Sequence, residues 1–237
     1  MTSKAETADR KIIFVTGTDT GVGKTLLAGL LLFHSRRTGC HALAMKPFCC
    51  GRMDDVRFLG ALQDGELSAE EMCPFSFVEP VAPLVAARRH HREIALAEVL
   101  ARIRKLARRC DRLIVEGCGG LLVPLGEDYT VEDLIRSLDC GVVVVARNKL
   151  GTINHTLLTV TTLQKMGVNR LQVAMMNVGR RDFSSSSNER ILRRMLLPVR
   201  LFSIPWLGPN AVQARAVRTK YKKTKKTLAR MMGTGIL

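Results

Sequence analysis

A glycine-rich stretch near the start of the chain carries the residue types of a phosphate-binding loop. Residues 14–25 read FVTGTDTGVGKT, an apolar run that breaks into glycines and closes on a lysine and a threonine. Glycines let backbone amides approach a phosphate, a lysine reaches the β- and γ-phosphates, and a threonine hydroxyl can ligate Mg²⁺. The alternative is a tight strand-to-helix turn, although such turns rarely need three glycines and a lysine. We assign nucleotide binding to Asp19, Thr20, Gly21, Val22, Gly23, Lys24 and Thr25.

Polar residues also end other apolar runs of the chain. Lys46 and Glu116 end the second and third runs, and Lys149 and Asn177 follow the next two. Ligands of open α/β sheets bind outside the carboxyl ends of the strands, so these side chains are expected to converge on one crevice. An acidic residue at a strand tip beside a phosphate loop is where such proteins hold Mg²⁺, which makes Glu116 a metal candidate. Each residue alone could be a solvated boundary residue, but their coincidence favours a site.

Two further segments could add ligands. Asp54 and Asp55 precede a helical apolar pattern, where an aspartate either caps the helix or supplies an oxygen to the same ion. Asp55 is the better metal candidate, because the pattern starts with it. Gly151–His155 opens a helix after the fourth strand, so its free amide groups form a second anion site for a carboxylate or a phosphate.

The elements that must position these residues alternate between strand and helix. Short β-rich apolar runs separated by segments of helical spacing predict an α/β fold, with a single-domain, doubly wound, mainly parallel sheet of the P-loop NTPase type. The expected strands are Lys11–Thr16, His41–Lys46, Asp111–Glu116, Gly141–Ala146, Leu171–Met176 and Val199–Ile204. Helices are expected after the phosphate loop and near Ile94–Arg109, Val131–Leu138, Ile153–Met166 and Asn188–Leu196, with Ser184–Ser187 as a short capping loop. Residues 1–237 are expected to form one domain, with a basic C-terminal helix at about 210–231.

The formal net charge of +16 is concentrated near the C-terminus, where 12 basic residues and no acidic ones follow Glu189. Residues 218–226, RTKYKKTKK, could contact nucleic acid, but a solvated helix face is favoured because Tyr221 is the one aromatic side chain available for base stacking. Nucleic acid is therefore not expected as a partner.

The remaining composition indicates a cytoplasmic protein. The N-terminal ten residues are polar, and the longest apolar stretch, Leu26–Phe33, is far too short to span a bilayer. The seven cysteines are odd in number and scattered, without a C-x-x-C pair or histidines at ligand spacing. They are expected to be reduced thiols rather than a disulfide framework or a zinc site.

With these residues assembled, the chain resembles the dethiobiotin synthetase family, ATP-dependent ligases of biotin biosynthesis. The resemblance covers most of the chain and rests on the segments GTDTGVGKT (17–25), KPFCCG (46–51), FVEPVAP (77–83), EGCGGLLVPL (116–125), KLGTINHTLLT (149–159), Asn177 and IPWL (204–207). Thr18 stands where the common phosphate loop has its first glycine, and that spacing is itself typical of the family. The motifs together are specific, whereas the loop alone would indicate only a P-loop ATPase.

The resemblance implies a reaction and a role for each motif. It implies that 7,8-diaminopelargonic acid takes up CO₂ as a carbamate, that ATP converts the carbamate into a carbamic-phosphoric anhydride, and that ring closure gives dethiobiotin, ADP and phosphate. Lys46, Lys24 and Cys50 would be catalytic, while Thr25, Asp55 and Glu116 would hold Mg²⁺. Asn177 with Pro205, Trp206 and Leu207 would bind adenine. Substrate would contact Lys46, Cys50, Gly151, Thr152 and Asn154, the last three across a homodimer interface.

Two departures and two rival functions remain. Cys50 replaces a serine usual in the family, which puts that serine's contribution in doubt, and Cys118 replaces a small residue. A partition or positioning ATPase would share the phosphate loop and could contact DNA through the basic tail, but its loop normally has a lysine at the position of Asp19. A non-catalytic homologue has Cys50 as its only support.

Overall fold

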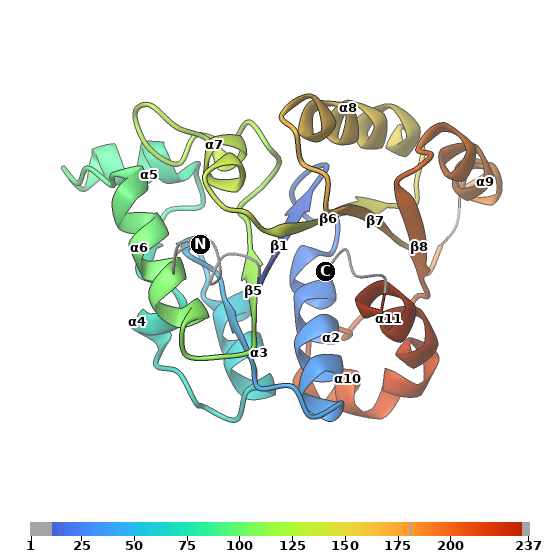
Figure 1. The fold of residues 1–237 in the computed structure, drawn as a ribbon, viewed down its shortest axis with the longest axis horizontal. Coiled ribbons are helices and arrows are strands. Elements are labelled where there is room, and N and C mark those ends of the chain that lie inside the picture. The colour runs from blue at the N-terminus through green and yellow to red at the C-terminus, as the bar shows by residue number, and fades with distance from the viewer. Residues whose placement is uncertain (1–10, 181, 234–237) are drawn as a thin grey trace, which may run out of the picture.

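A six-stranded parallel sheet forms the centre of the computed structural model, which describes residues 11–180 and 182–233 (Figure 1). Its strand order is β2-β5-β1-β6-β7-β8, and every neighbouring pair is parallel. The strands are β1 (Ile12–Gly17), β2 (Ala42–Met45), β5 (Arg112–Glu116), β6 (Gly141–Arg147), β7 (Leu171–Met176) and β8 (Arg200–Ile204). The doubly wound α/β fold predicted from the sequence is confirmed. The polar N-terminal ten residues lie outside the described part.

Helices cover both faces of this sheet (Figure 1). One face packs against α2 (Lys24–Arg37), α3 (Asp54–Leu62), α10 (Ala214–Lys220) and α11 (Lys225–Met232). The other packs against α6 (Leu96–Ala107), α7 (Val131–Arg136), α8 (Thr152–Lys165) and α9 (Ser185–Met195). Two short helices, α4 (Ala69–Met72) and α5 (Pro83–Arg89), and a 3₁₀ turn η1 (Tyr221–Lys223) complete the described helical segments. None of the helices in the described ranges is long and apolar enough to cross a membrane.

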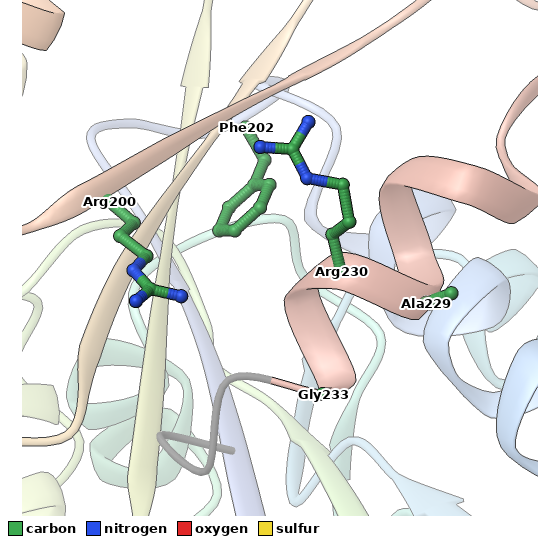
Figure 2. A pocket seen from close by; sticks show the side chains of 5 residues that line it. All are labelled: Arg200, Phe202, Ala229, Arg230 and Gly233. Atoms are coloured by element: carbon green, nitrogen blue, oxygen red, sulfur yellow. The ribbon is translucent and has the colours of Figure 1, made fainter.

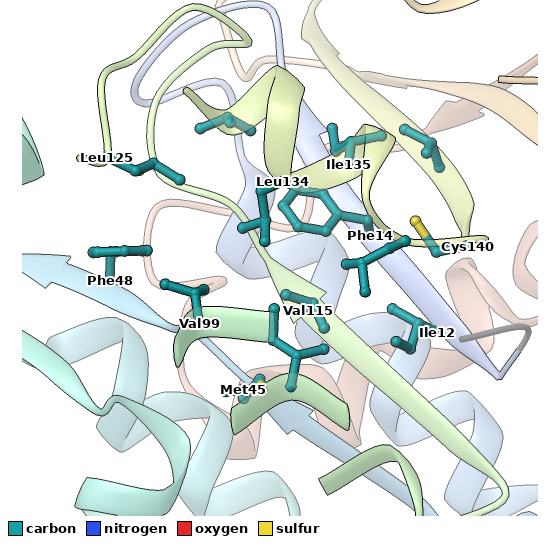
Figure 3. Packing of buried hydrophobic residues seen from close by; sticks show 14 of the residues in the cluster. Ile12, Phe14, Met45, Phe48, Val99, Val115, Leu125, Leu134, Ile135 and Cys140 are labelled. Carbon is teal, nitrogen blue, oxygen red and sulfur yellow. The ribbon is translucent and has the colours of Figure 1, made fainter. Parts of the chain in front are cut away.

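Alternate residues of each central strand serve the two faces. In β1, Phe14 belongs to the cluster with α6 and α7, while Val15 belongs to the cluster with α2. Figure 3 shows the first cluster, where Phe14 lies beside Val115 of β5 and Leu134 of α7. Because both faces are buried, the strands read as continuous apolar runs, which explains why the sequence reveals them.

A second, two-stranded parallel sheet was not predicted. It pairs β3 (Phe48–Cys50) with β4 (Phe75–Phe77), and three-residue strands are too short to leave a periodic signal in the sequence. The rings of Phe48 and Phe75 stack with centroids 5.0 Å apart. This small sheet continues from the end of β2 and thereby places Cys49 and Cys50 close to Lys46.

Helices α2 and α3 approach each other closely at Gly29. A Cβ atom on Gly29 would lie 2.4 Å from Cε1 of Phe58 in α3, a distance that no packed side chain tolerates. Helix α2 begins at Lys24 and α3 begins at Asp54. The contact therefore fixes the helix that follows the phosphate loop against the helix that carries Asp55.

The expected loop Ser184–Ser187 was wrong, because α9 already begins at Ser185. The side chain of Asp182 explains the earlier start: its Oδ1 accepts a hydrogen bond of 3.0 Å from the Ser185 amide. Hydroxyl donors from Ser184 and Ser185 also reach this oxygen, at 2.7 and 2.9 Å. An aspartate three residues upstream thus caps the first turn, which is where the serines were expected to act.

The basic tail is not the single helix expected at about 210–231. Residues 210–213 are not helical, and η1 separates α10 from α11. Tyr221, in η1, is buried and its hydroxyl lies 2.6 Å from Nδ1 of His34 in α2. Farther along, Figure 2 shows Arg230 of α11 beside the ring of Phe202 in β8, with its Cζ 5.9 Å from the ring centroid. The tail packs on the sheet and α2, and Tyr221 is buried at the point where the helix is interrupted.

Candidate functional site

A cavity of about 710 Å³ opens where the phosphate loop meets the carboxyl ends of β2 and β5. It brings together predicted residues from four separate segments of the chain. These are Thr20, Gly21, Gly23, Lys24, Thr25, Lys46, Cys50, Asp55 and Glu116. The expected convergence of strand ends on one crevice is therefore present for β1, β2 and β5.

The phosphate loop needs its glycines for backbone reasons. Gly21 and Gly23 have φ angles of 71° and 107°, a region that side chains rarely adopt. A Cβ on Gly23 would also lie 3.2 Å from Cγ of Met176 at the end of β7. Gly23 is the residue before α2, so the free amides of that helix point into the loop. The loop is built to bring backbone N–H groups against an anion.

Lys24 lies inside this loop rather than in solvent. It is 7% exposed, and its Nζ donates a 2.7 Å hydrogen bond to the carbonyl oxygen of Asp19. Burial lowers the pKa of Lys24, and the neighbouring Glu116 carboxylate opposes this shift. The side chain of Asp19 accepts from the Thr20 amide at 2.7 Å, while Val22 is buried in the apolar cluster around α2. Those two residues shape the loop without lining the cavity.

Lys46 connects the two carboxylates of the site. Its Nζ lies 2.9 Å from Oε1 of Glu116 and forms a second ion pair with Asp55. The same Glu116 oxygen accepts a 2.7 Å hydrogen bond from the Thr25 hydroxyl. Burial lowers the pKa of Lys46, but the Glu116 and Asp55 carboxylates outweigh it and raise the pKa above its usual value. Lys46 is therefore a charged ammonium group in the cavity wall.

Glu116 retains acceptor capacity for a metal ion. Its side chain is 1% exposed, and Oε2 is buried without a hydrogen-bond partner among the described residues. Burial raises the pKa of Glu116, against the effect of the Lys46 charge. No group of three or more His, Cys, Asp or Glu side chains within residues 11–180 and 182–233 could hold a metal. This donor set fits Mg²⁺, which takes one or two carboxylates, a hydroxyl and substrate phosphates rather than a full protein cage.

Thiols line the cavity to an extent that the sequence did not predict. Cys49, Cys50 and Cys118 all face it. Burial raises the pKa of Cys50 to about 12, so this thiol is neutral at physiological pH. The neighbouring Cys73 thiol lowers the pKa of Cys49 below its usual value. Cys50 can thus donate a weak hydrogen bond, as the serine it replaces would, but it is poorly suited to act as a nucleophile.

Sequence reasoning missed several other lining residues. They are Leu26, Arg52, Pro80, Val81, Ala82, Gly119, Val123 and Val212. The segments containing residues 80–82 and 123 were singled out as motifs but given no role, whereas Gly119 was expected only to let the backbone approach substrate. Arg52 and Val212 carried no signal, since one follows a strand of three residues and the other lies in the non-helical start of the tail.

The residues assigned to adenine lie together, although they do not line this cavity. Asn177 donates to Ser203 Oγ and accepts from Asn148 Nδ2, both at 2.9 Å. A Cβ on Gly179 would be 2.8 Å from Nε1 of Trp206, so the indole packs on the loop that follows Asn177. Pro205 precedes this indole and Leu207, which is buried, follows it.

Gly151, Thr152 and Asn154 form the N-terminal turn of α8, away from the lining of the same chain's cavity. Gly151 has φ 88°, and the Thr152 hydroxyl is buried 3.5 Å from that of Thr156. Asn154 is exposed, and so are the neighbouring apolar residues Leu150 and Leu158, at 78% and 61%. The turn is accessible to another molecule.

An AAA domain family matches residues 11–211. The chain is 40% identical to an ATP-dependent dethiobiotin synthetase from Anaeromyxobacter dehalogenans over 86% of this chain and 94% of the relative. It is 41% identical to one from Bacillus licheniformis over 84% of each chain.

Among solved structures, the MinC:MinD cell division complex of Aquifex aeolicus aligns with a TM-score of 0.60 at 12% identity, over 94% of this chain and 96% of that one. A ParA family ATPase from Chlorobium tepidum gives 0.58 at 15%, over 94% and 97%. These two likenesses concern the fold alone.

Proposed function

We propose, from the premise that this chain belongs to the dethiobiotin synthetase family, how its cavity carries out ATP-dependent dethiobiotin synthesis. The family resemblance inferred from the motifs is confirmed by these relatives. The proposal concerns the steps and the residues: carboxylation of 7,8-diaminopelargonic acid by CO₂, activation by ATP and ring closure, in a cyclo-ligase whose single domain spans residues 1–237.

The observation that carries the proposal is the placement of two buried ammonium groups in one cavity. Lys24 and Lys46 are 7% and 8% exposed, and both line it. A carbamate and the ATP γ-phosphate are both anions, and bringing them together requires positive charge between them. Fixed charges in a buried site stabilise a phosphoryl-transfer transition state far more than solvated ones do.

The reaction then needs little covalent chemistry from the protein. One amine of the substrate adds CO₂ and releases a proton, giving the carbamate. A carbamate oxygen attacks the γ-phosphorus and ADP leaves. The second amine then attacks the anhydride carbon, expels phosphate and releases a proton, which gives the cyclic urea. Lys46 holds the carbamate and γ-phosphate, Lys24 holds the phosphates, and the Cys50 thiol donates a hydrogen bond. These side chains act by positioning and charge neutralisation.

Magnesium is proposed as the second cofactor beside ATP. Thr25, Asp55 and Glu116 would hold it, and it would supply neutralising charge at the β- and γ-phosphates. The orphaned Oε2 of Glu116 supports this assignment.

The ends of the two substrates are assigned to the remaining predicted residues. Asn177 with Pro205, Trp206 and Leu207 would bind adenine, as their clustering beside Gly179 supports. Gly151, Thr152 and Asn154 would bind the substrate carboxylate from the partner subunit of a homodimer. The exposed turn at the start of α8 suits that role.

A DNA-contacting partition ATPase is less supported. Tyr221, the aromatic residue available for base stacking in the tail, is 8% exposed and bonded to His34. Arg218 is likewise engaged, at 3.0 Å from Asp64. Two of the tail residues that would contact DNA therefore already make contacts within the folded protein.

Isotope incorporation tests the proposal. Purified protein is incubated with Mg-ATP, diaminopelargonic acid and ¹³C-bicarbonate, and products are followed by mass spectrometry and phosphate release. We expect labelled dethiobiotin, equimolar ADP, and little ATP hydrolysis when either the diamine or bicarbonate is omitted. ATP hydrolysis that ignores the diamine and rises with DNA would overturn the proposal in favour of the partition ATPase. Nucleotide binding without either reaction would indicate the non-catalytic homologue.

A further inference from the structure

The connection between β8 and α10, residues 205–213, forms part of the nucleotide side of the cavity. Trp206 packs against Gly179, and Val212 lines the cavity itself. Between them, Leu207 and Ala211 are 3% and 4% exposed and belong to the apolar cluster around α2. This connection therefore contains three of the four proposed adenine residues, and it contacts the cavity and the helix that follows the phosphate loop.

Few polar contacts hold this connection in place. Within the described residues, no backbone hydrogen bond reaches Pro205–Val212 from the rest of the molecule. A single side-chain hydrogen bond does so: Lys220 Nζ donates to the Leu207 carbonyl oxygen at 2.5 Å. A charged donor makes a stronger hydrogen bond than a neutral one, by roughly a factor of two.

Gly208 makes this contact possible. Its φ angle is 96°, and a Cβ there would lie 3.0 Å from Lys220 Nζ. The missing side chain lets the ammonium group of Lys220 reach the backbone from the end of α10. The glycine and the lysine thus form one local arrangement, although they are separated in sequence by the first helix of the tail.

Lys220 is itself held by the elements on both sides of it. Tyr221 bonds to His34 at 2.6 Å and packs edge-on against Phe33, with centroids 5.2 Å apart. Arg218 donates to the Ala61 carbonyl oxygen at 3.1 Å and pairs with Asp64, just beyond α3. The neighbours of Lys220 are therefore anchored to α2 and to the end of α3, and the ammonium group acts from a rigid base.

We propose that Lys220 is a positioning residue for the nucleotide, which fixes the Pro205–Leu207 segment through the Leu207 carbonyl so that it can receive the base. The inference rests on the proposed adenine site but not on the carboxylation chemistry. It gives the basic tail a function in nucleotide recognition. Loss of the bond should loosen the base-binding segment while leaving Lys24, Lys46 and Glu116 in place.

The test compares Lys220→Met with Lys226→Met. Both variants lose one positive charge from the tail, but Lys226 is exposed. Trp206 is the one tryptophan of the chain and is 46% exposed, so intrinsic fluorescence reports on this segment. ATP and GTP are titrated against each protein, and KM for ATP and kcat are measured separately.

We expect Lys220→Met to weaken ATP binding by roughly 10-fold, the size of one charged hydrogen bond, and to reduce discrimination against GTP. At saturating ATP, kcat should change by less than about 2-fold, since the phosphate-binding residues are intact. Lys226→Met should match the wild type, and Lys220→Arg should restore most of the ATP affinity. Lys220→Gln, which removes the charge but keeps a polar side chain, should behave like Lys220→Met and serves if that variant fails to fold.

Three results would overturn the inference. One is an unchanged ATP affinity in Lys220→Met; another is a loss in kcat with KM unaffected. The third is a Trp206 fluorescence that does not change when nucleotide is added to the wild-type protein, since the base would then bind elsewhere. Failure of the proposed function gives a different result: ATP would still change Trp206 fluorescence in a Lys220-dependent manner, but no dethiobiotin would form.

Discussion

Lys46 Nζ lies 2.9 Å from Glu116 Oε1 in a buried ion pair, and the other Glu116 oxygen has no hydrogen-bond partner in the described chain. The pair occupies the tips of β2 and β5, which are neighbours in the sheet. The cavity thus contains a charged donor that is already oriented and a carboxylate oxygen that is free for a further cation.

Replacing Lys46 by methionine should reduce dethiobiotin formation on the order of 10² or more, because the charge that stabilises the transferring group is lost. Nucleotide affinity should survive, since the phosphate loop and Lys24 are untouched. Calorimetry with ATP and a turnover assay separate the two effects. The variant leaves two carboxylates unpaired, so circular dichroism must first show a folded protein. Lost ATP binding with persistent turnover would mean that Lys46 has been given the wrong role.

The His34–Tyr221 contact predicts a pH-dependent stability. Burial lowers the pKa of His34, with Arg112 and Lys225 adding to the effect. The folded state therefore favours neutral histidine. This contribution is complete above the unfolded pKa of about 6.5 and is lost as pH falls through that value toward the lower folded pKa. His34→Gln should consequently show a shallower fall in Tm between pH 7.5 and 5.

Tyr221→Phe is the matched control for this effect. It removes the hydroxyl group but keeps His34 buried, so it should lower Tm at every pH by the equivalent of about 1 kcal/mol and retain the pH dependence. Scanning fluorimetry across the pH range distinguishes the two variants. If Tm falls equally steeply with pH in the wild type and in His34→Gln, another group is responsible for the loss of stability at low pH.

Cys50 should tolerate serine with little change in turnover. Because burial raises the pKa of this thiol to about 12, very little of it is ionised at pH 8. Alkylation of Cys50 should be slow at neutral pH and accelerate with rising pH, and modification should inhibit through bulk in the cavity. Iodoacetamide labelling followed by peptide mapping gives the rate at each cysteine. A phosphoryl or acyl adduct trapped on Cys50 would contradict the noncovalent mechanism.

The proposed intersubunit site can be tested by complementation between two inactive variants. Each variant, Lys24→Ala or Asn154→Ala, should have little dethiobiotin synthetase activity when it is assayed alone. In a mixed dimer one cavity collects both substitutions and the other neither, so random equal mixing, with about half the dimers mixed, should restore roughly a quarter of wild-type sites under C₂ symmetry. Coexpression with two affinity tags isolates the mixed species. No recovery in confirmed mixed dimers would place Asn154 in its own subunit's site or in none.

The fold and the phosphate side of the cavity could be predicted because their signals are local. The buried strands appear as apolar runs, and Lys46 and Glu116 stand at the ends of such runs. Arg52 and Val212 lie in irregular segments that happen to pass the cavity. The course of such segments leaves no hydrophobic periodicity in the sequence. Tyr221 was considered for base stacking because a sequence does not show that His34, far earlier in the chain, lies against it. The role of Asn154 stays a prediction, since it depends on a second subunit.

The close approach of α2 and α3 at Gly29 should make this position sensitive to substitution. A methyl group at this position would meet the Phe58 ring at 2.4 Å and separate α2 from α3, moving Thr25 relative to Asp55. In a saturation mutagenesis screen for growth without biotin, position 29 should therefore score as intolerant as the lysines that line the cavity, although it touches neither substrate. Substitutions that shrink Phe58 should rescue Gly29→Ala. Such a suppressor pair would show that α2 and α3 must keep a fixed spacing for the protein to function.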